Sequence, residues 1–226
     1  MNSKGFIFDL DGVIVDTARY HYLSWKKLAR TLGFDITEKQ NEQLKGISRK
    51  KSLQIVLDWG NIAYSDEEFT KLIKAKNNDY LAYIADMTSE EILPGVSALL
   101  DYLIAKNQPI ALGSASKNAK TILKKTGIFH KFNAIVDGNG ISKAKPDPEV
   151  FITAAKKMNI APKNCIVFED SVAGIEAARR AGMTAVGIGD KNTLNQADYV
   201  FKNMAQIGFD FIDKFVENES KLYHTR

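Results

Sequence analysis

Short apolar runs alternate with helix-forming segments along most of the chain, and this alternation constrains the fold more than any other feature. The runs cover residues 6–8, 109–112, 134–136, 165–168 and 185–188, and glycine or polar residues follow each of them. Uninterrupted apolar runs of this length are typical of parallel strands that are buried on both faces. With helical segments between them, they predict an α/β fold built on a doubly wound, Rossmann-like parallel sheet.

Residues 18–90 interrupt this alternation. Their pattern is helical, with Tyr22, Trp25 and Leu32 on one apolar face, and we expect Trp25 to be a core residue. The alternation resumes at Pro94-Gly95. We therefore predict an α/β core of residues 1–17 and 91–226, with a helical cap of residues 18–90 inserted after the first strand. The polar tail from residue 214 onward is expected to fray.

Composition narrows the possible partners and compartments. A net charge of +4 is too small for a nucleic-acid-binding face but suits small anionic substrates. No apolar stretch approaches the roughly 18 residues of a membrane span, and the N-terminus lacks the form of a secretory signal. We expect a cytoplasmic protein, without nucleic-acid or membrane partners and monomeric for lack of an exposed apolar stripe. The single cysteine, Cys165, lies in an apolar run and is expected to be buried.

Acidic side chains follow several of the predicted strands, at the sheet edge where parallel sheets bind ligands. Asp9 and Asp11 follow the first run, Asp137 follows the third, and Glu169 and Asp170 follow the fourth. Acids gathered at one edge repel one another, so a divalent cation or a basic group is needed there. Carboxylate oxygens without Cys or His ligands favour Mg²⁺.

Several of these residues have an ordinary structural interpretation when taken alone. The pair Asp9 and Asp11 fits a simple turn as well as it fits a nucleophile and an acid–base group on one side of an extended segment. Ser114 favours a plain helix N-cap, although a hydroxyl at a helix start also suits phosphate. Of the two lysines in the loop of residues 142–148, Lys143 and Lys145, one could neutralise a phosphoryl group.

Taken together and in order, the motifs resemble those of the haloacid dehalogenase superfamily of phosphoryl-transfer enzymes. Residues 6–17 resemble its first motif, and Ser114, Lys145 and the pair Glu169-Asp170 resemble the second, third and fourth. The helical insert resembles the cap of that superfamily. Residues 41–49, together with residues 16–21, 76–80 and 113–118, are similar to segments of its sugar-phosphate mutases.

The resemblance implies roles for the core residues. Asp9 would be the nucleophile that becomes an aspartyl phosphate, and Asp11 would be the general acid and base. Ser114 and Lys145 would hold the transferring phosphoryl group. The residues implied to bind Mg²⁺ are Asp9, Asp11 through its main-chain carbonyl, Glu169 and Asp170.

It also implies roles for the cap and its surroundings. The substrate-binding residues would be Asp11, Lys45, Gly46, Ile47, Arg49, Lys76, Ser116, Lys117 and Asn118. Arg49 offers a planar, bidentate fork for a second phosphate group. Thr17, His21 and Lys76 would position Asp11 and the closed cap. Without the resemblance, we would predict Lys76 to be an exposed, solvated lysine and His21 to be a packed or solvated helical histidine.

The activity implied is the interconversion of β-D-glucose 1-phosphate and β-D-glucose 6-phosphate. It would pass through an aspartyl phosphate and β-glucose 1,6-bisphosphate, so the partners would be hexose phosphates and a hexose bisphosphate. A small sugar-phosphate phosphatase on the same fold is the alternative, in which water attacks the phosphoenzyme. A non-catalytic regulator that binds phosphosugars is a third possibility, against which the pair Asp9 and Asp11 argues.

Overall fold

The computed structural model describes residues 3–216, and the predicted fraying of the tail falls largely on residues 217–226, outside the described part. Six parallel strands form one sheet in the order β3-β2-β1-β4-β5-β6. The strands are β1 (Gly5–Phe8), β2 (Ile110–Gly113), β3 (Ala134–Val136), β4 (Cys165–Glu169), β5 (Thr184–Ile188) and β6 (Tyr199–Phe201). The chain winds outward in both directions from the central pair β1 and β4, so the predicted doubly wound fold is confirmed.

The sixth strand is the one that the sequence pattern did not predict. β6 lies at the edge of the sheet, where Tyr199 is exposed and Val200 and Phe201 are only partly buried. Its residues Tyr199-Val200-Phe201 are an apolar run as long as that of β3, the other edge strand, so the omission of β6 from the prediction was wrong.

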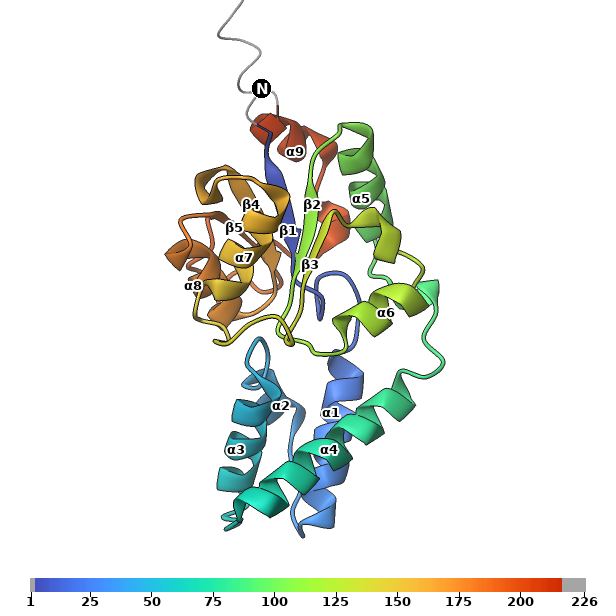
Figure 1. The fold of residues 1–226 in the computed structure, drawn as a ribbon, viewed down its shortest axis with the longest axis vertical. Helices are drawn as coiled ribbons and strands as arrows, with labels where there is room; N and C mark the ends of the chain where they lie inside the picture. The colour runs from blue at the N-terminus through green and yellow to red at the C-terminus, as the bar shows by residue number, and fades with distance from the viewer. Residues whose placement is uncertain (1–2, 217–226) are drawn as a thin grey trace, which may run out of the picture.

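Helices cover both faces of the sheet (Figure 1). On one side lie α5 (Val96–Ala105), α6 (Ala119–Lys125) and α9 (Phe209–Val216), and on the other α7 (Glu149–Met158) and α8 (Val172–Arg180). Alternate residues of β1 face opposite sides, so Phe6 and Phe8 pack in the first layer and Ile7 in the second. Single 3₁₀ turns occupy Ser89–Glu91, Phe129–Lys131, Pro162–Asn164 and Met204–Gln206.

Four further helices lie beyond one end of the sheet (Figure 1). They are α1 (Ala18–Thr31), α2 (Glu38–Glu42), α3 (Arg49–Trp59) and α4 (Asp66–Tyr83). They share a hydrophobic cluster of their own, whose buried members include Trp25, Leu28, Leu53, Val56 and Leu57. A separate core supports our proposal that residues 18–90 form a cap domain on a core of residues 1–17 and 91–226.

The two chain crossings between cap and core are bonded to each other. Leu93 donates its main-chain N–H to the carbonyl of Ile14 at 3.0 Å, and Asp16 donates to the carbonyl of Glu91 at 3.2 Å. The Arg19 guanidinium lies 2.7 Å from the Glu91 carboxylate beside them. These bonds fix the two crossings side by side. Within residues 3–216 no helix combines the length and the apolar character that a membrane span requires.

We predict that the cap depends on its own cluster for stability. Leu53 is fully buried, and Leu53→Ala leaves a cavity that should lower the free energy of unfolding by about 2–5 kcal/mol. Ile104 is 46% exposed on a core helix, and Ile104→Ala should change it by no more than about 0.5 kcal/mol. Urea denaturation followed by circular dichroism measures both, and equal effects would contradict the prediction.

Candidate active site

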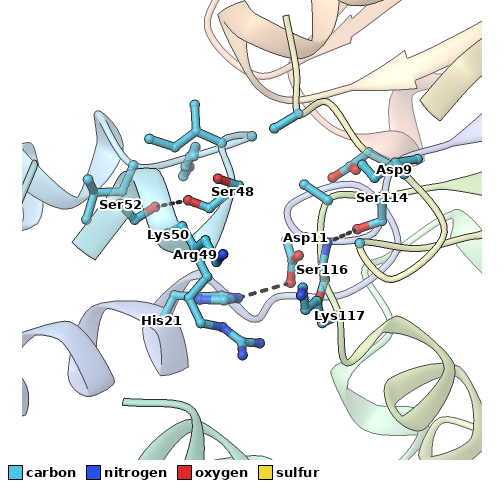
Figure 2. A pocket seen from close by; sticks show the side chains of 18 of the residues that line it. Asp9, Asp11, His21, Ser48, Arg49, Lys50, Ser52, Ser114, Ser116 and Lys117 are labelled. Atoms are coloured by element: carbon cyan, nitrogen blue, oxygen red, sulfur yellow. Dashed lines mark hydrogen bonds and ion pairs between the residues drawn. The ribbon is translucent and has the colours of Figure 1, made fainter. Parts of the chain in front are cut away.

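A cavity of about 400 Å³ lies between the carboxyl end of the sheet and the cap helices. This volume is within the range of roughly 300–1,000 Å³ that small-molecule sites occupy. Figure 2 shows cap side chains on one side of it and core side chains on the other. The labelled cap residues are His21, Ser48, Arg49, Lys50 and Ser52, and those of the core are Asp9, Asp11, Ser114, Ser116 and Lys117.

Three carboxylates and one lysine form the buried floor of the site. Because β1 and β4 pair in register from Gly5 with Cys165 to Phe8 with Phe168, Asp9 comes to lie beside Glu169. Each of Asp9, Glu169 and Asp170 offers an oxygen within 4.8 Å of the others. Lys145 Nζ donates to Asp9 Oδ1 at 2.6 Å and to Glu169 Oε2 at 2.7 Å.

The charges in this cluster do not balance. Burial raises the pKa of Asp9 well above its usual range, and burial together with Glu169 raises that of Asp170 to about 7. Burial works against the charge of Lys145, but Asp9 and Glu169 outweigh it, so the pKa of this lysine is raised and it remains an ammonium. Two ammonium groups, those of Lys145 and of Lys45 beside Asp170, face three carboxylates, which leaves net negative charge when all three are ionised. The all-oxygen donor set of Asp9, Glu169 and Asp170 fits Mg²⁺.

A glycine is required where the loop after β1 passes this cluster. Gly12 has a φ of +82°, and a Cβ at this position would overlap the carboxylate of Asp170. Any side chain here would both strain the backbone and displace an acid of the cluster.

Asp11 is held apart from the carboxylate cluster. It accepts a hydrogen bond from the Thr17 hydroxyl, and His21 Nε2 lies 3.7 Å from its Oδ1 (Figure 2). Burial acts to raise the pKa of Asp11, but His21, Thr17 and Lys76 together outweigh it and leave the pKa lowered. The carboxylate of Asp11 is not part of the metal-binding group, and the metal role predicted for this residue concerns its main-chain carbonyl.

Lys76 is buried, so its interpretation as an exposed, solvated lysine is wrong. It is 1% exposed, and its Nζ lies 3.0 Å from His21 Nδ1 and about 5 Å from the ring centres of Trp25 and Tyr80, at 4.6 and 4.8 Å. Burial and the charge of Arg49 lower its pKa to about 7. With Lys76 as the donor, His21 carries its proton on Nε2, the nitrogen that faces Asp11. Burial also lowers the pKa of His21.

The loop after β2 presents hydroxyl and main-chain groups to the cavity. Ser114 Oγ accepts from the Ser116 N–H at 3.0 Å, and Ser116 Oγ accepts from the Asn118 N–H at 3.3 Å. Because α6 begins only at Ala119, Ser114 is not the N-cap of that helix. Asn118 Nδ2 donates to Asn77 Oδ1 on α4 at 3.1 Å, which ties the core to the cap.

The cap loop before α3 rests on the core. Lys45 Nζ lies 3.5 Å from Asp170 Oδ2, and a Cβ on Gly46, whose φ is +72°, would overlap the hydroxyl of Ser171. The ammonium group of Lys45 is therefore paired with Asp170, an acid of the floor. Ile47 also lines the cavity.

Arg49 and Lys117 are two of the cations that line the cavity away from the carboxylate floor. Arg49, the first residue of α3, and Lys117, in the loop before α6, approach it from opposite sides (Figure 2). Within residues 3–216 neither side chain has a hydrogen-bond or ion-pair partner, and burial lowers the pKa of Arg49. An arginine and a lysine without counter-charges form a site for an anion.

Some lining residues were missed by sequence reasoning. Asn41, Ser48, Lys50 and Ser52 of the cap line the cavity, as do core residues 141–144. Ser48 carries one local signal, because it is the N-cap of α3 and accepts from the Lys51 N–H at 3.3 Å. Nothing in the spacing of the others distinguishes them from surface or core positions.

The fold and this site define a class of protein, and comparison with known sequences agrees. A model of the haloacid dehalogenase-like hydrolase family matches residues 3–182, and the chain belongs to that family. It is 42% identical over 211 residues to a beta-phosphoglucomutase of Bacillus subtilis (strain 168), covering 92% of this chain and 93% of that protein.

Two further comparisons point in different directions. A crystal structure of beta-phosphoglucomutase from Clostridium difficile superposes with a TM-score of 0.91 at 45% identity, covering 95% of this chain and 97% of that one. A fructose-1-phosphate phosphatase of Escherichia coli (strain K12) is 30% identical over 184 residues, covering 81% of this chain and 95% of that protein. The chain is therefore similar both to a mutase and to a phosphatase.

We predict that Mg²⁺ binding depends on pH through the carboxylate floor. A pKa of about 7 for Asp170 means that below pH 7 a proton competes with the cation, so the affinity should fall about tenfold per pH unit. It should level off above pH 7. Isothermal titration calorimetry at pH 6, 7 and 8 measures this dependence. Asp170→Asn should bind Mg²⁺ more weakly and with a shallower pH dependence, and equal wild-type affinities at pH 6 and 8 would contradict the prediction.

Proposed function

We propose that the protein is a β-phosphoglucomutase, which interconverts β-D-glucose 1-phosphate and β-D-glucose 6-phosphate. The observation that carries this proposal is the presence of two phosphate-compatible groups in one cavity. Lys145 and Ser114 lie at the carboxylate floor, and the unpaired Arg49 and Lys117 lie away from it. A substrate with a phosphate at one end alone would leave Arg49 and Lys117 without an anionic partner.

In this proposal Asp9 attacks the phosphorus atom and becomes an aspartyl phosphate. Lys145, which already contacts Asp9, and Ser114 hold the oxygens of the transferring phosphoryl group. Asp11 donates a proton to the leaving sugar oxygen and accepts one from the attacking hydroxyl. Its lowered pKa suits the second of these tasks, and the contacts with Thr17 and His21 hold its carboxylate in place.

The carboxylates of Asp9, Glu169 and Asp170 would hold Mg²⁺ together with the main-chain carbonyl of Asp11. When bound, this cation neutralises negative charge on the transferring phosphoryl group. Lys145 shares that task from its position between Asp9 and Glu169. The raised pKa values of Asp9 and Asp170 agree with a place in which a further positive charge is favoured.

The second phosphate would bind between cap and core. Arg49 offers two parallel N–H groups from the cap, and Ser116, Lys117 and Asn118 approach from the core. The bisphosphate could leave the site and bind again with its other phosphate toward Asp9. Gly46 and Ile47 would contact the sugar, and Lys76 would act on Asp11 through His21. The cap loop rests on the core at Lys45 and Gly46, and in this proposal a cap closed over the sugar would keep water from the phosphoenzyme.

A sugar-phosphate phosphatase is the second candidate, and the similarity to the Escherichia coli phosphatase supports it. The carboxylate floor would serve both reactions, since they share the phosphoenzyme. They differ in whether a sugar hydroxyl or water reaches it.

An assay of two products separates these candidates. Purified protein is incubated with Mg²⁺, β-glucose 1-phosphate and a trace of glucose 1,6-bisphosphate, and glucose 6-phosphate and free phosphate are measured together. We expect glucose 6-phosphate to form in large excess. Rapid free phosphate with little glucose 6-phosphate would establish the phosphatase instead, and no turnover would favour a binding protein.

Arg49 should matter for the mutase reaction more than for simple hydrolysis. Arg49→Ala removes a charged hydrogen-bonding partner worth about 1.5–3 kcal/mol, so mutase kcat/KM should fall roughly tenfold to a hundredfold. Hydrolysis of an aryl phosphate, which has no second phosphate, should change little. Lys51→Ala, an exposed cation on the same helix outside the cavity lining, serves as the control. Equal losses in the two reactions would remove the second-phosphate role of Arg49.

A further inference from the structure

Asn41 has a side chain that the proposed mechanism does not use. It lies in the last turn of α2, where its main-chain N–H donates to the carbonyl of Thr37 at 3.1 Å. The residue is 5% exposed and lines the cavity. Within residues 3–216 its side-chain amide has no hydrogen-bond partner.

A buried amide without partners is costly, because it loses its hydrogen bonds to water and gains none in return. The hydroxyl of Tyr80 is the side-chain polar atom that is sealed in this way within the described residues. The amide of Asn41 is not sealed, so it keeps contact with accessible space. Since Asn41 lines the cavity, that space is where a ligand would supply the missing partners.

The hydroxyl groups of the cavity lining named next each already make one hydrogen bond within the protein. Ser52 Oγ donates to the carbonyl of Ser48 at 3.2 Å, and Ser48 Oγ accepts from the Lys51 N–H. Ser116 Oγ accepts from the Asn118 N–H across the cavity. Among the described residues that line the cavity, Asn41 is the one side-chain amide, able to donate and to accept at once.

We propose that Asn41 determines sugar specificity by hydrogen-bonding to a hydroxyl of the bound sugar. The inference rests on the proposed function in one respect, that the cavity holds a phosphorylated sugar. Phosphate groups are matched by the cations at both ends, whereas the ring between them carries neutral hydroxyls. An amide carbonyl accepts from one such hydroxyl, and its NH₂ donates to the same or the neighbouring one. A site built in this way rejects an analogue that lacks the hydroxyl.

The position of Asn41 is well defined by its surroundings. The side chains of Thr37 and Gln40 form a capping box that fixes the start of α2. Four residues after Asn41, Lys45 contacts Asp170 of the core floor. The amide is therefore held between a fixed helix start and a fixed cap–core contact, as a selective contact requires.

The test pairs a change in the protein with a change in the substrate. kcat/KM is measured for wild type and Asn41→Ala with a hexose phosphate and with its 2-, 3- and 4-deoxy analogues. We expect Asn41→Ala to lower kcat/KM for the parent substrate by about tenfold. One deoxy analogue should be a poorer substrate of the wild type by a similar factor and lose nothing further in the variant. For each of the other analogues, the ratio of its kcat/KM to that of the parent substrate should be the same in the wild type and in Asn41→Ala.

Equal penalties for every deoxy analogue in wild type and variant would overturn the proposal, because a purely structural role acts on all substrates alike. Gln43→Ala changes an exposed amide of the same segment and should leave the pattern of penalties unaltered. Asn41→Leu keeps nearly the same shape without any hydrogen-bonding group, so it provides the same test should Asn41→Ala fail to fold.

The two proposals fail in different ways. kcat/KM can be measured from either product. Release of free phosphate alone would therefore overturn the mutase proposal, while the test of Asn41 could still be made. Absence of turnover with any hexose phosphate would overturn both.

Discussion

The rest of the site depends on one buried interaction, the contact of Lys145 with Asp9 and Glu169. An ammonium removed from water is stable only where acceptors surround it, and carboxylates only where cations do. The pairing of β1 with β4 brings the two acids together, and the loop before α7 supplies the lysine. Asp170 adds another negative charge, so the floor is suited to a divalent cation and to chemistry on an anionic group.

The cap covers this floor, so that a cavity forms between the cap and the core. Lys45 contacts Asp170 at one point and Asn77 contacts Asn118 at another, so the cap is bonded to two separate core loops. Between these contacts lie Arg49 and Lys117, whose charges have no counter-charge in the described residues. In the proposed mechanism a mutase and a phosphatase would share this floor, and the groups that reach Asp9 from the cap side would distinguish them. This explains how one chain can resemble both.

The sheet and the order of the motifs were predictable because they depend on local patterns. A strand buried on both faces must be apolar throughout, and ligand-binding side chains in such a sheet follow directly after it. Asp9, Ser114 and Glu169 were found on that basis. β6 was missed although Tyr199-Val200-Phe201 is an apolar run as long as that of β3.

The sequence by itself determined the α/β class and the acids of the floor and predicted a helical insert, since each follows from residue type and spacing along the chain. Spacing left Lys143 and Lys145 open, and only the family resemblance favoured Lys145. Only the tertiary structure decided which side chains far apart in sequence face each other. It buries Lys76 against His21, Trp25 and Tyr80, pairs Asn77 with Asn118 and turns Asn41 into the cavity. The physical reason is that burial and partner choice depend on how the cap helices pack over the sheet, and no local pattern encodes that packing.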